Sequence, residues 1–148
     1  MDHNLNYGFL LERTSKKLKQ TLQRNFNEIG AIITVDQWVI MYELFKHGSL
    51  SQNQIGENTY KDAPTVTRII DLLAKKNLVK RKMSKEDRRK YFIELTKKGT
   101  ETIEKLLPDV IEFRKKGWEG LDQSDLQALN VIVDKVFYNM SDKEEQKK

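Results

Sequence analysis

Residues 61–99 read KDAPTVTRIIDLLAKKNLVKRKMSKEDRRKYFIELTKKG and concentrate net positive charge within this 148-residue chain. Between Lys75 and Lys98 there are 11 Lys/Arg and 3 Asp/Glu, a net charge of +8, whereas the whole chain carries +5. The residues outside that segment therefore sum to −3. Positive charge gathered in one local structure indicates a polyanionic partner, and we interpret this structure as a DNA-reading element.

The first half of this stretch predicts a helix over about 64–76 with two different faces. At about 100° per residue, its apolar face gathers Val66, Ile69, Ile70 and Leu73. Its opposite face carries Pro64, Thr67, Arg68, Asp71 and Lys75, with Thr65 on the flank. A helix that only packs on a core needs the apolar face alone. The hydroxyls, arginine and lysine of the second face are the groups that a helix would offer to a major groove. Thr65 and Thr67 also suit capping or surface positions, and Asp71 also suits an exposed helix position.

Two runs with the alternation of β-strands follow at 79–83 and 91–95, joined by a charged linker. In the second run Tyr91 and Ile93 share one face, and Glu94 lies on the other. Together the runs predict a β-hairpin, the wing of a winged helix. A charge run by itself is also typical of a solvated hairpin tip, but its position directly after two short helices favours nucleic-acid contact.

A short helix is predicted just before the charged stretch. Ser51 and Gln54 fit a capping box, and Leu50 and Ile55 occupy the two hydrophobic-staple positions. A tight turn at 60–62 joins this helix to the next one. Two short helices joined by such a turn form a helix-turn-helix.

Amphipathic helices flank this middle region on both sides. A first helix is predicted over roughly 6–28, and a second begins with a capping box at 34–37. After the hairpin, apolar repeats predict two more helices, of which Pro108 should kink or break the first and Asp122 begins the last. The apolar stripes at both ends of the chain need partners, some of which we expect in a second subunit.

The composition excludes several classes of function. The chain has no cysteine, which rules out disulfides, thiol sensing, cysteine nucleophiles and Cys-ligated zinc. Its two histidines, His3 and His47, lie in no ligand-like cluster, so we expect no metal and no cofactor. We find no nucleophile–base pattern and no glycine-rich phosphate loop, so an enzyme is not indicated. Without a signal-peptide core or a membrane-length apolar run, we expect a cytoplasmic protein with no membrane partner.

These blocks resemble the MarR family of bacterial winged-helix transcription regulators. The likeness is carried by TVTRIIDLL at 65–73, LVKR at 78–81, DRR at 87–89 and LTKKG at 95–99. The flanking helices fit as well, so the resemblance covers nearly the whole chain. One departure is Asn77, where the family often has glycine at a helix end, but asparagine also adopts the left-handed conformation.

The resemblance implies a mainly α fold with a small β-hairpin wing. A winged helix-turn-helix domain would be flanked by N- and C-terminal dimerisation helices. We expect a single domain over 1–148, with dimerisation helices at 1–30 and 100–140, the winged helix-turn-helix at 34–99 and a frayed tail at 141–148. The resemblance also implies a homodimer that binds a pseudo-palindromic operator in double-stranded DNA, with recognition helices in successive major grooves.

Residue roles follow from this resemblance and from local chemistry. The expected DNA-binding residues are Ser51, Gln52, Asn53, Pro64, Thr65, Thr67, Arg68, Lys75, Arg88 and Arg89. The first three begin a helix, where backbone N–H groups favour phosphate, and Arg68 suits either guanine or phosphate. One of the two wing-tip arginines would enter the minor groove. The wing-bracing acids would be Asp71 and Asp87, with Arg89 as the expected partner of Asp71.

The implied function is a DNA-binding transcription regulator, most often a repressor, that is released by a small aromatic or lipophilic ligand. The expected pocket residues are Phe9, Arg13, Trp38, Met41 and Tyr42, although the last three also suit a core. A regulator without a ligand remains open. The alternative from another class is a winged-helix module that binds protein instead of DNA, and the +8 segment argues against it.

Overall fold

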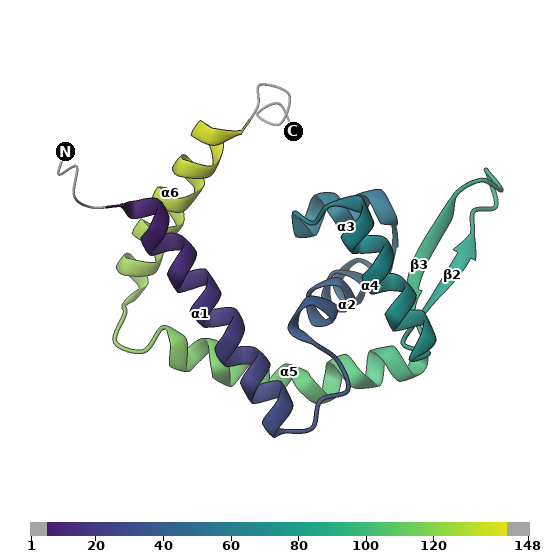
Figure 1. Ribbon diagram of the computed structural model, residues 1–148, viewed down its shortest axis with the longest axis horizontal. Helices are drawn as coiled ribbons and strands as arrows, with labels where there is room; N and C mark the ends of the chain where they lie inside the picture. The colour runs from purple at the N-terminus through teal and green to yellow at the C-terminus, as the bar shows by residue number, and fades with distance from the viewer. Residues whose placement is uncertain (1–5, 142–148) are drawn as a thin grey trace. The chain divides into compact units, whose positions relative to one another are not determined.

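The computed structural model describes residues 6–141 and divides into two compact units, Met1–Phe113 and Arg114–Lys148 (Figure 1). His3 and most of the predicted tail, residues 142–148, lie outside the described residues. The elements in chain order are α1 (Tyr7–Glu28), α2 (Val35–His47), β1 (Ser49–Ser51), α3 (Gln52–Thr59), α4 (Ala63–Lys75), β2 (Val79–Met83), β3 (Tyr91–Leu95), α5 (Lys97–Gly117) and α6 (Gln123–Met140). The fold is mainly α with a small sheet, as predicted.

Local caps define the first two helices at the predicted places. The Asn6 side chain accepts a hydrogen bond from the Phe9 N–H (2.9 Å) and starts α1. After α1, Gly30 adopts a left-handed φ of 69° and turns the chain. α2 starts with a capping box in which the Thr34 hydroxyl accepts from the Gln37 N–H (3.2 Å) and the Gln37 side chain accepts from the Thr34 N–H (3.1 Å). Helix starts set by such short-range bonds are readable from sequence.

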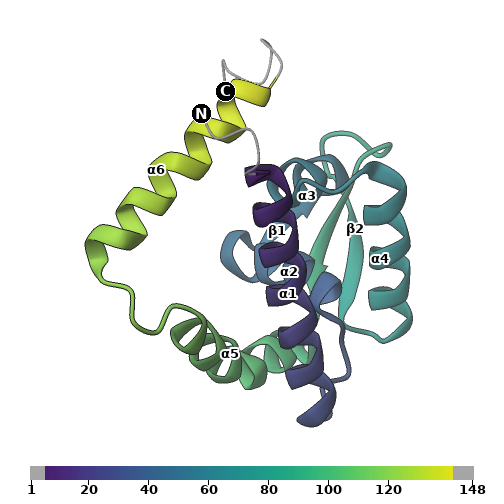
Figure 2. The same ribbon diagram turned by 60° about the vertical axis from the view of Figure 1, so that its left-hand side comes forward.

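α3 and α4 form the predicted helix-turn-helix. Ser51 and Gln54 make the capping box of α3. Asp62 caps α4, and Pro64 lies in its first turn, where its missing N–H leaves no hydrogen bond unmade. α4 packs beside the wing strand β2 (Figures 1 and 2). The wing and the second helix of the motif are therefore neighbours.

The end of α4 is closed by its own backbone and by the start of α5. Asn77 adopts the left-handed conformation (φ 58°), and the Leu78 N–H donates to the Leu73 carbonyl (3.0 Å). The Leu78 carbonyl in turn accepts from the Thr96 N–H (3.0 Å). A Cβ at Gly99 would lie only 2.1 Å from that carbonyl oxygen. Only glycine fits there, which explains the last residue of the LTKKG block.

The sheet has three strands, one more than predicted. β2 and β3 pair antiparallel, with Val79 opposite Leu95 and Met83 opposite Tyr91. β1 pairs with the other edge of β3, which gives the order β1-β3-β2. β1 escaped prediction because three residues are too few to show a strand pattern.

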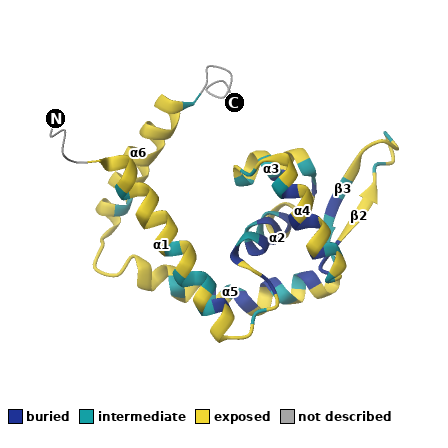
Figure 3. Ribbon diagram, viewed as in Figure 1, coloured by how far each residue is buried: buried dark blue, intermediate teal, exposed yellow. Residues whose placement is uncertain are grey.

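The core of the first unit is formed by α2, α3, α4, β3 and one side of α5 (Figure 3). The predicted apolar face of α4 is buried: Val66, Ile69, Ile70 and Leu73. α5 contributes Ile103, Leu106 and Val110. The helix runs through Pro108 to Gly117, so of the two predicted outcomes, a kink or a break, the break is wrong; buried side chains on either side of the proline hold the helix in place.

The second unit contains α6, which begins at the predicted capping box of Asp122 and Asp125. α6 has no buried residue, although it carries a long apolar stripe. Among the described residues, no helix is both long and apolar enough to cross a membrane.

Candidate nucleic-acid interface

The outer face of α4 is exposed along its whole length. Pro64, Thr67, Arg68 and Lys75 are all exposed, as predicted for residues that meet a ligand outside the chain. They line one shallow groove together with Ala63, Asp71 and Leu72. Leu72, 37 % exposed, was missed from the sequence, although its position beside this face can be read from the helical projection. The face thus combines cationic, hydroxyl and apolar groups, the mixture that reads base edges and thymine methyl groups.

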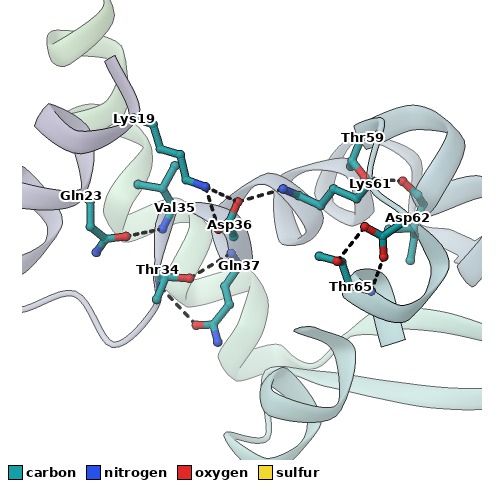
Figure 4. Close-up of polar contacts among 11 residues, drawn as sticks. Lys19, Gln23, Thr34, Val35, Asp36, Gln37, Thr59, Lys61, Asp62 and Thr65 are labelled. Carbon is teal, nitrogen blue, oxygen red and sulfur yellow. Dashed lines mark hydrogen bonds and ion pairs between the residues drawn. The ribbon is translucent and has the colours of Figure 1, made fainter. Parts of the chain in front are cut away.

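Thr65 has a capping role, one of the two roles that the sequence left open. Its N–H donates to Asp62 Oδ1 (2.8 Å) and its hydroxyl donates to Asp62 Oδ2 (3.0 Å; Figure 4). These bonds, followed by the charge of Arg68, hold the pKa of Asp62 below its ordinary value. The Thr65 hydroxyl therefore keeps only acceptor capacity for a further partner.

Thr67 is oriented by the preceding helix. The Gln52 side-chain amide donates to the Thr67 hydroxyl oxygen (2.9 Å), which links the first residue of α3 to the outer face of α4. The hydroxyl hydrogen of Thr67 remains available as a donor. At the start of α3, the Ser51 hydroxyl accepts from the Gln54 N–H (3.2 Å), and Asn53 is exposed. Of the three predicted residues at this helix start, Gln52 contacts α4 directly.

The wing is braced by Asp71, but through a different arginine from the one predicted. Asp71 forms an ion pair with Arg81 on β2, and not with Arg89. β2 runs beside α4, whereas Arg89 lies in the tip beyond Met83, the last paired residue of β2. Position along the hairpin therefore selects the partner. The ion pair of Arg81 and Asp71 joins the wing strand to the outer face of α4.

Asp87 shapes the tip of the wing. Its carboxylate accepts from the Arg89 N–H (3.0 Å), its carbonyl accepts from the Lys90 N–H (2.9 Å), and its own N–H donates to the Ser84 hydroxyl (3.3 Å). These bonds fold the linker into a tight loop. Arg88 and Arg89 are both exposed on this loop, so their guanidinium groups are carried by an ordered support.

The predicted pocket residues fall into two groups that differ in burial. Met41 has no exposed surface and Trp38 only 3 %, and the Trp38 ring stacks on Tyr42 at 5.5 Å between centroids. Trp38 and Met41 are core residues, the other role that the sequence allowed, and Tyr42 is partly buried against that core. Phe9 is 58 % exposed and Arg13 is exposed, both on α1. A separate cavity of about 190 Å³ lies between the α1–α2 connection and α5, and none of the five lines it. Within residues 6–141, no group of His, Asp and Glu side chains is arranged to hold a metal ion.

Comparison with known proteins places this geometry among transcription regulators. The family model described as "MarR family" matches residues 33–91. The HTH-type transcriptional regulator PrsX of Escherichia coli is 30 % identical over 137 residues, which cover 90 % of this chain and 82 % of PrsX. The HTH-type transcriptional repressor IacR of Pseudomonas putida is 25 % identical over 132 residues, covering 89 % of this chain and 78 % of IacR.

Solved structures share the fold. The Staphylococcus aureus MepR–DNA complex superposes with a TM-score of 0.82 at 22 % identity, covering 92 % of this chain and 99 % of MepR. Bordetella bronchiseptica BpsR, solved in a study of how 6-hydroxynicotinic acid regulates its DNA binding, superposes with a TM-score of 0.77 at 24 % identity, covering 89 % of this chain and 98 % of BpsR.

Proposed function

Because the chain belongs to the MarR family of transcription regulators, which are not enzymes, we propose that it is a sequence-specific, double-stranded DNA-binding repressor. We assign residues 34–99 as its winged helix-turn-helix, and 1–30 and 100–140 as its dimerisation helices. The observation that carries the proposal is the exposed outer face of α4, with an ordered wing beside it. The cytoplasm, where DNA is accessible, is the proposed location.

Each part of the interface takes one task. Arg68 and Thr67 read base edges, and Leu72 adds apolar contact with a thymine methyl group. Thr65, Pro64, Lys75 and the start of α3 position α4 against the backbone, where phosphate contacts fix register without sequence information. Arg88 or Arg89 enters the minor groove from the wing tip.

The active form is proposed to be a homodimer on a pseudo-palindromic operator. Support comes from α6, which exposes a stripe of apolar residues at helical spacing: Leu129, Ile132, Val133, Val136, Phe137 and Met140. An exposed apolar surface of this kind marks an association site. A dimer would place two copies of α4 at the spacing of successive major grooves.

Release from DNA is proposed to follow binding of a small aromatic or lipophilic ligand. Support comes from the likeness to BpsR, whose DNA binding is regulated by 6-hydroxynicotinic acid. Such a ligand acts only if it binds one arrangement of the dimer more tightly than the other. The chain has no cysteine, so a cysteine-oxidation signal is excluded.

Titration of a labelled duplex from upstream of the chain's own gene, at several salt concentrations, tests the proposal. We expect saturable binding of one dimer per duplex, much tighter than to an unrelated duplex, with a steep salt slope. Arg68→Ala should weaken binding to the specific duplex by roughly 10- to 100-fold and to the unrelated one far less. Arg24→Ala, an exposed arginine on α1, is the matched control. Absence of binding to both duplexes at low salt would instead support the protein-interaction module.

A further inference from the structure

Both ends of α4 are tied to one short segment, residues 32–37, at the start of α2. Before α4, the Lys61 ammonium contacts Asp36 Oδ1 at 2.8 Å. After α4, the Lys76 ammonium donates to the Ile32 carbonyl (2.6 Å) and to Gln37 Oε1 (3.0 Å). The two lysines thus reach from opposite ends of one helix to the same few residues.

The same segment is also tied to α1. Lys19 contacts both carboxylate oxygens of Asp36, at 3.0 and 2.9 Å, so that Asp36 lies between Lys19 and Lys61 (Figure 4). One turn further along α1, the Gln23 side chain accepts from the Val35 N–H (2.9 Å). Residues 32–37 therefore connect the N-terminal helix to both ends of α4.

The contacts of Gln37 and Lys61 are better defined than ordinary surface pairs. Gln37 is only 4 % exposed, and its side-chain oxygen also caps α2, so it is fixed in orientation when it meets Lys76. The Lys61 side chain is 19 % exposed. Burial alone would raise the pKa of Asp36, but the hydrogen bonds and charges of Lys61 and Lys19 together outweigh it and hold that pKa below its ordinary value.

We propose that residues 32–37 form a clamp that positions α4, with Asp36 holding its beginning through Lys61, and with Ile32 and Gln37 holding its end through Lys76. Lys61 and Lys76 are then positioning residues, because their ammonium groups bind protein oxygens and not DNA phosphate. A displacement of α1 is carried to both ends of α4 at once, because all three helices meet at this segment. The inference rests on the proposed DNA-binding function of α4.

The first test is DNA binding by Asp36→Asn, Lys61→Met and Lys76→Met, with Lys75→Met as matched control. Lys75 is the neighbour of Lys76 but lies exposed on the outer face of α4. The specific probe is a duplex selected from a random library with the wild-type chain, and an unrelated duplex serves for comparison. The clamp variants should lose roughly tenfold in affinity for the selected duplex only, because a misplaced helix loses base contacts but keeps its charge. Lys75→Met should weaken both duplexes alike and lower the salt slope by about one.

The second test is amide hydrogen exchange in the free protein, which does not depend on DNA. Asp36→Asn should speed exchange in the turn before α4, and Lys76→Met in its last turn, while Lys75→Met should change neither. The clamp is overturned if Lys61→Met and Lys76→Met behave like Lys75→Met on both duplexes. It is also overturned if amide exchange is unchanged in both Asp36→Asn and Lys76→Met. If the wild type selects no duplex, the proposed function fails, and exchange alone still decides the clamp.

Discussion

α4 and α6 begin with the same kind of cap but differ in how their apolar faces are buried. Each is amphipathic and capped by an aspartate, Asp62 for α4 and Asp122 for α6. α4 buries its apolar face within its own unit, whereas α6 buries nothing and leaves residues such as Ile132 60 % exposed. Capping chemistry therefore fixes where a helix begins. Packing decides whether its apolar face is buried by its own chain or by another. The proposed DNA-reading helix belongs to the first kind and the proposed dimer helix to the second.

The largest effect is expected where α6 meets its proposed partner. Ile132→Glu places a charge in an apolar interface and should weaken the dimer by about 4 kcal/mol, roughly a thousandfold in dissociation constant. Analytical ultracentrifugation over a concentration series measures it. Val131→Glu is the control, because Val131 lies on the opposite side of α6 and is 59 % exposed. Equal effects of the two substitutions would mean that the stripe is not the dimer face.

In the unit that contains α4, the free energy of unfolding is expected to be most sensitive to substitution at Gly99. Gly99→Ala would drive a Cβ to 2.1 Å from the Leu78 carbonyl oxygen, which is backbone and cannot turn away. We expect a loss of about 3 kcal/mol in the free energy of unfolding, measured by urea denaturation. Gly8→Ala, whose new Cβ would meet only Asn6 Oδ1 at 3.4 Å, should be neutral or slightly stabilising. An unchanged midpoint for Gly99→Ala would show that the start of α5 moves away from the Leu78 carbonyl at little cost.

Removing either helix cap should have an effect of intermediate size, and the two effects should differ in kind between α4 and α6. Asp62→Ala should cost about 1 kcal/mol of stability through loss of the helix cap. Asp122→Ala should act instead on the helicity of α6, in a way that depends on protein concentration. Circular dichroism melts at several concentrations distinguish the two results. A concentration-independent loss in Asp122→Ala would contradict completion of α6 by a second copy.

Acid should erase both cap effects. Hydrogen bonds from Thr65 lower the pKa of Asp62, and those from Asp125 and Ser124 lower the pKa of Asp122, in each case from 3.8. A carboxylate with a lowered native pKa stabilises the fold above its unfolded-state pKa, and this contribution disappears as pH falls through the native value. The difference in melting temperature between wild type and each alanine variant should therefore be full at pH 7 and shrink below about pH 4. A constant difference down to pH 2 would exclude the ionised cap as its source.

The smallest effect is expected between α4 and the wing. Asp71 and Arg81 are both partly exposed, so a double-mutant cycle with Asp71→Asn and Arg81→Gln should give a coupling below about 1 kcal/mol in the free energy of unfolding. The parallel cycle with Arg89→Gln in place of Arg81→Gln should give none. Equal coupling in the two cycles would mean that both arginines share Asp71 in solution.

The sequence predicted the elements whose determinants are local. Capping boxes at Thr34, Ser51 and Asp122 each lie within four residues, and the helices begin there as expected. The left-handed turn at Asn77 and the hairpin strands were also predicted correctly.

The errors concern long-range geometry. β1 exists only because Leu50 pairs with Ile93, more than forty positions away. Asp71 was given the wrong arginine because the sequence shows three arginines on one wing but not how far the hairpin extends past α4. α5 continues through Pro108 because buried neighbours on both sides outweigh one missing hydrogen bond. The clamp at residues 32–37 was invisible because it joins residues up to 44 positions apart.

The order β1-β3-β2 leaves β2 as an edge strand, with Lys80, Arg81 and Lys82 exposed along it. Unpaired strand edges recruit strands from other molecules, and lysine on the edge is one of the ways in which natural sheets prevent this. The charges along β2 thus protect the protein from sheet-to-sheet aggregation. Neutralising the wing would expose the chain to self-association through its backbone, a hazard separate from any loss of DNA binding.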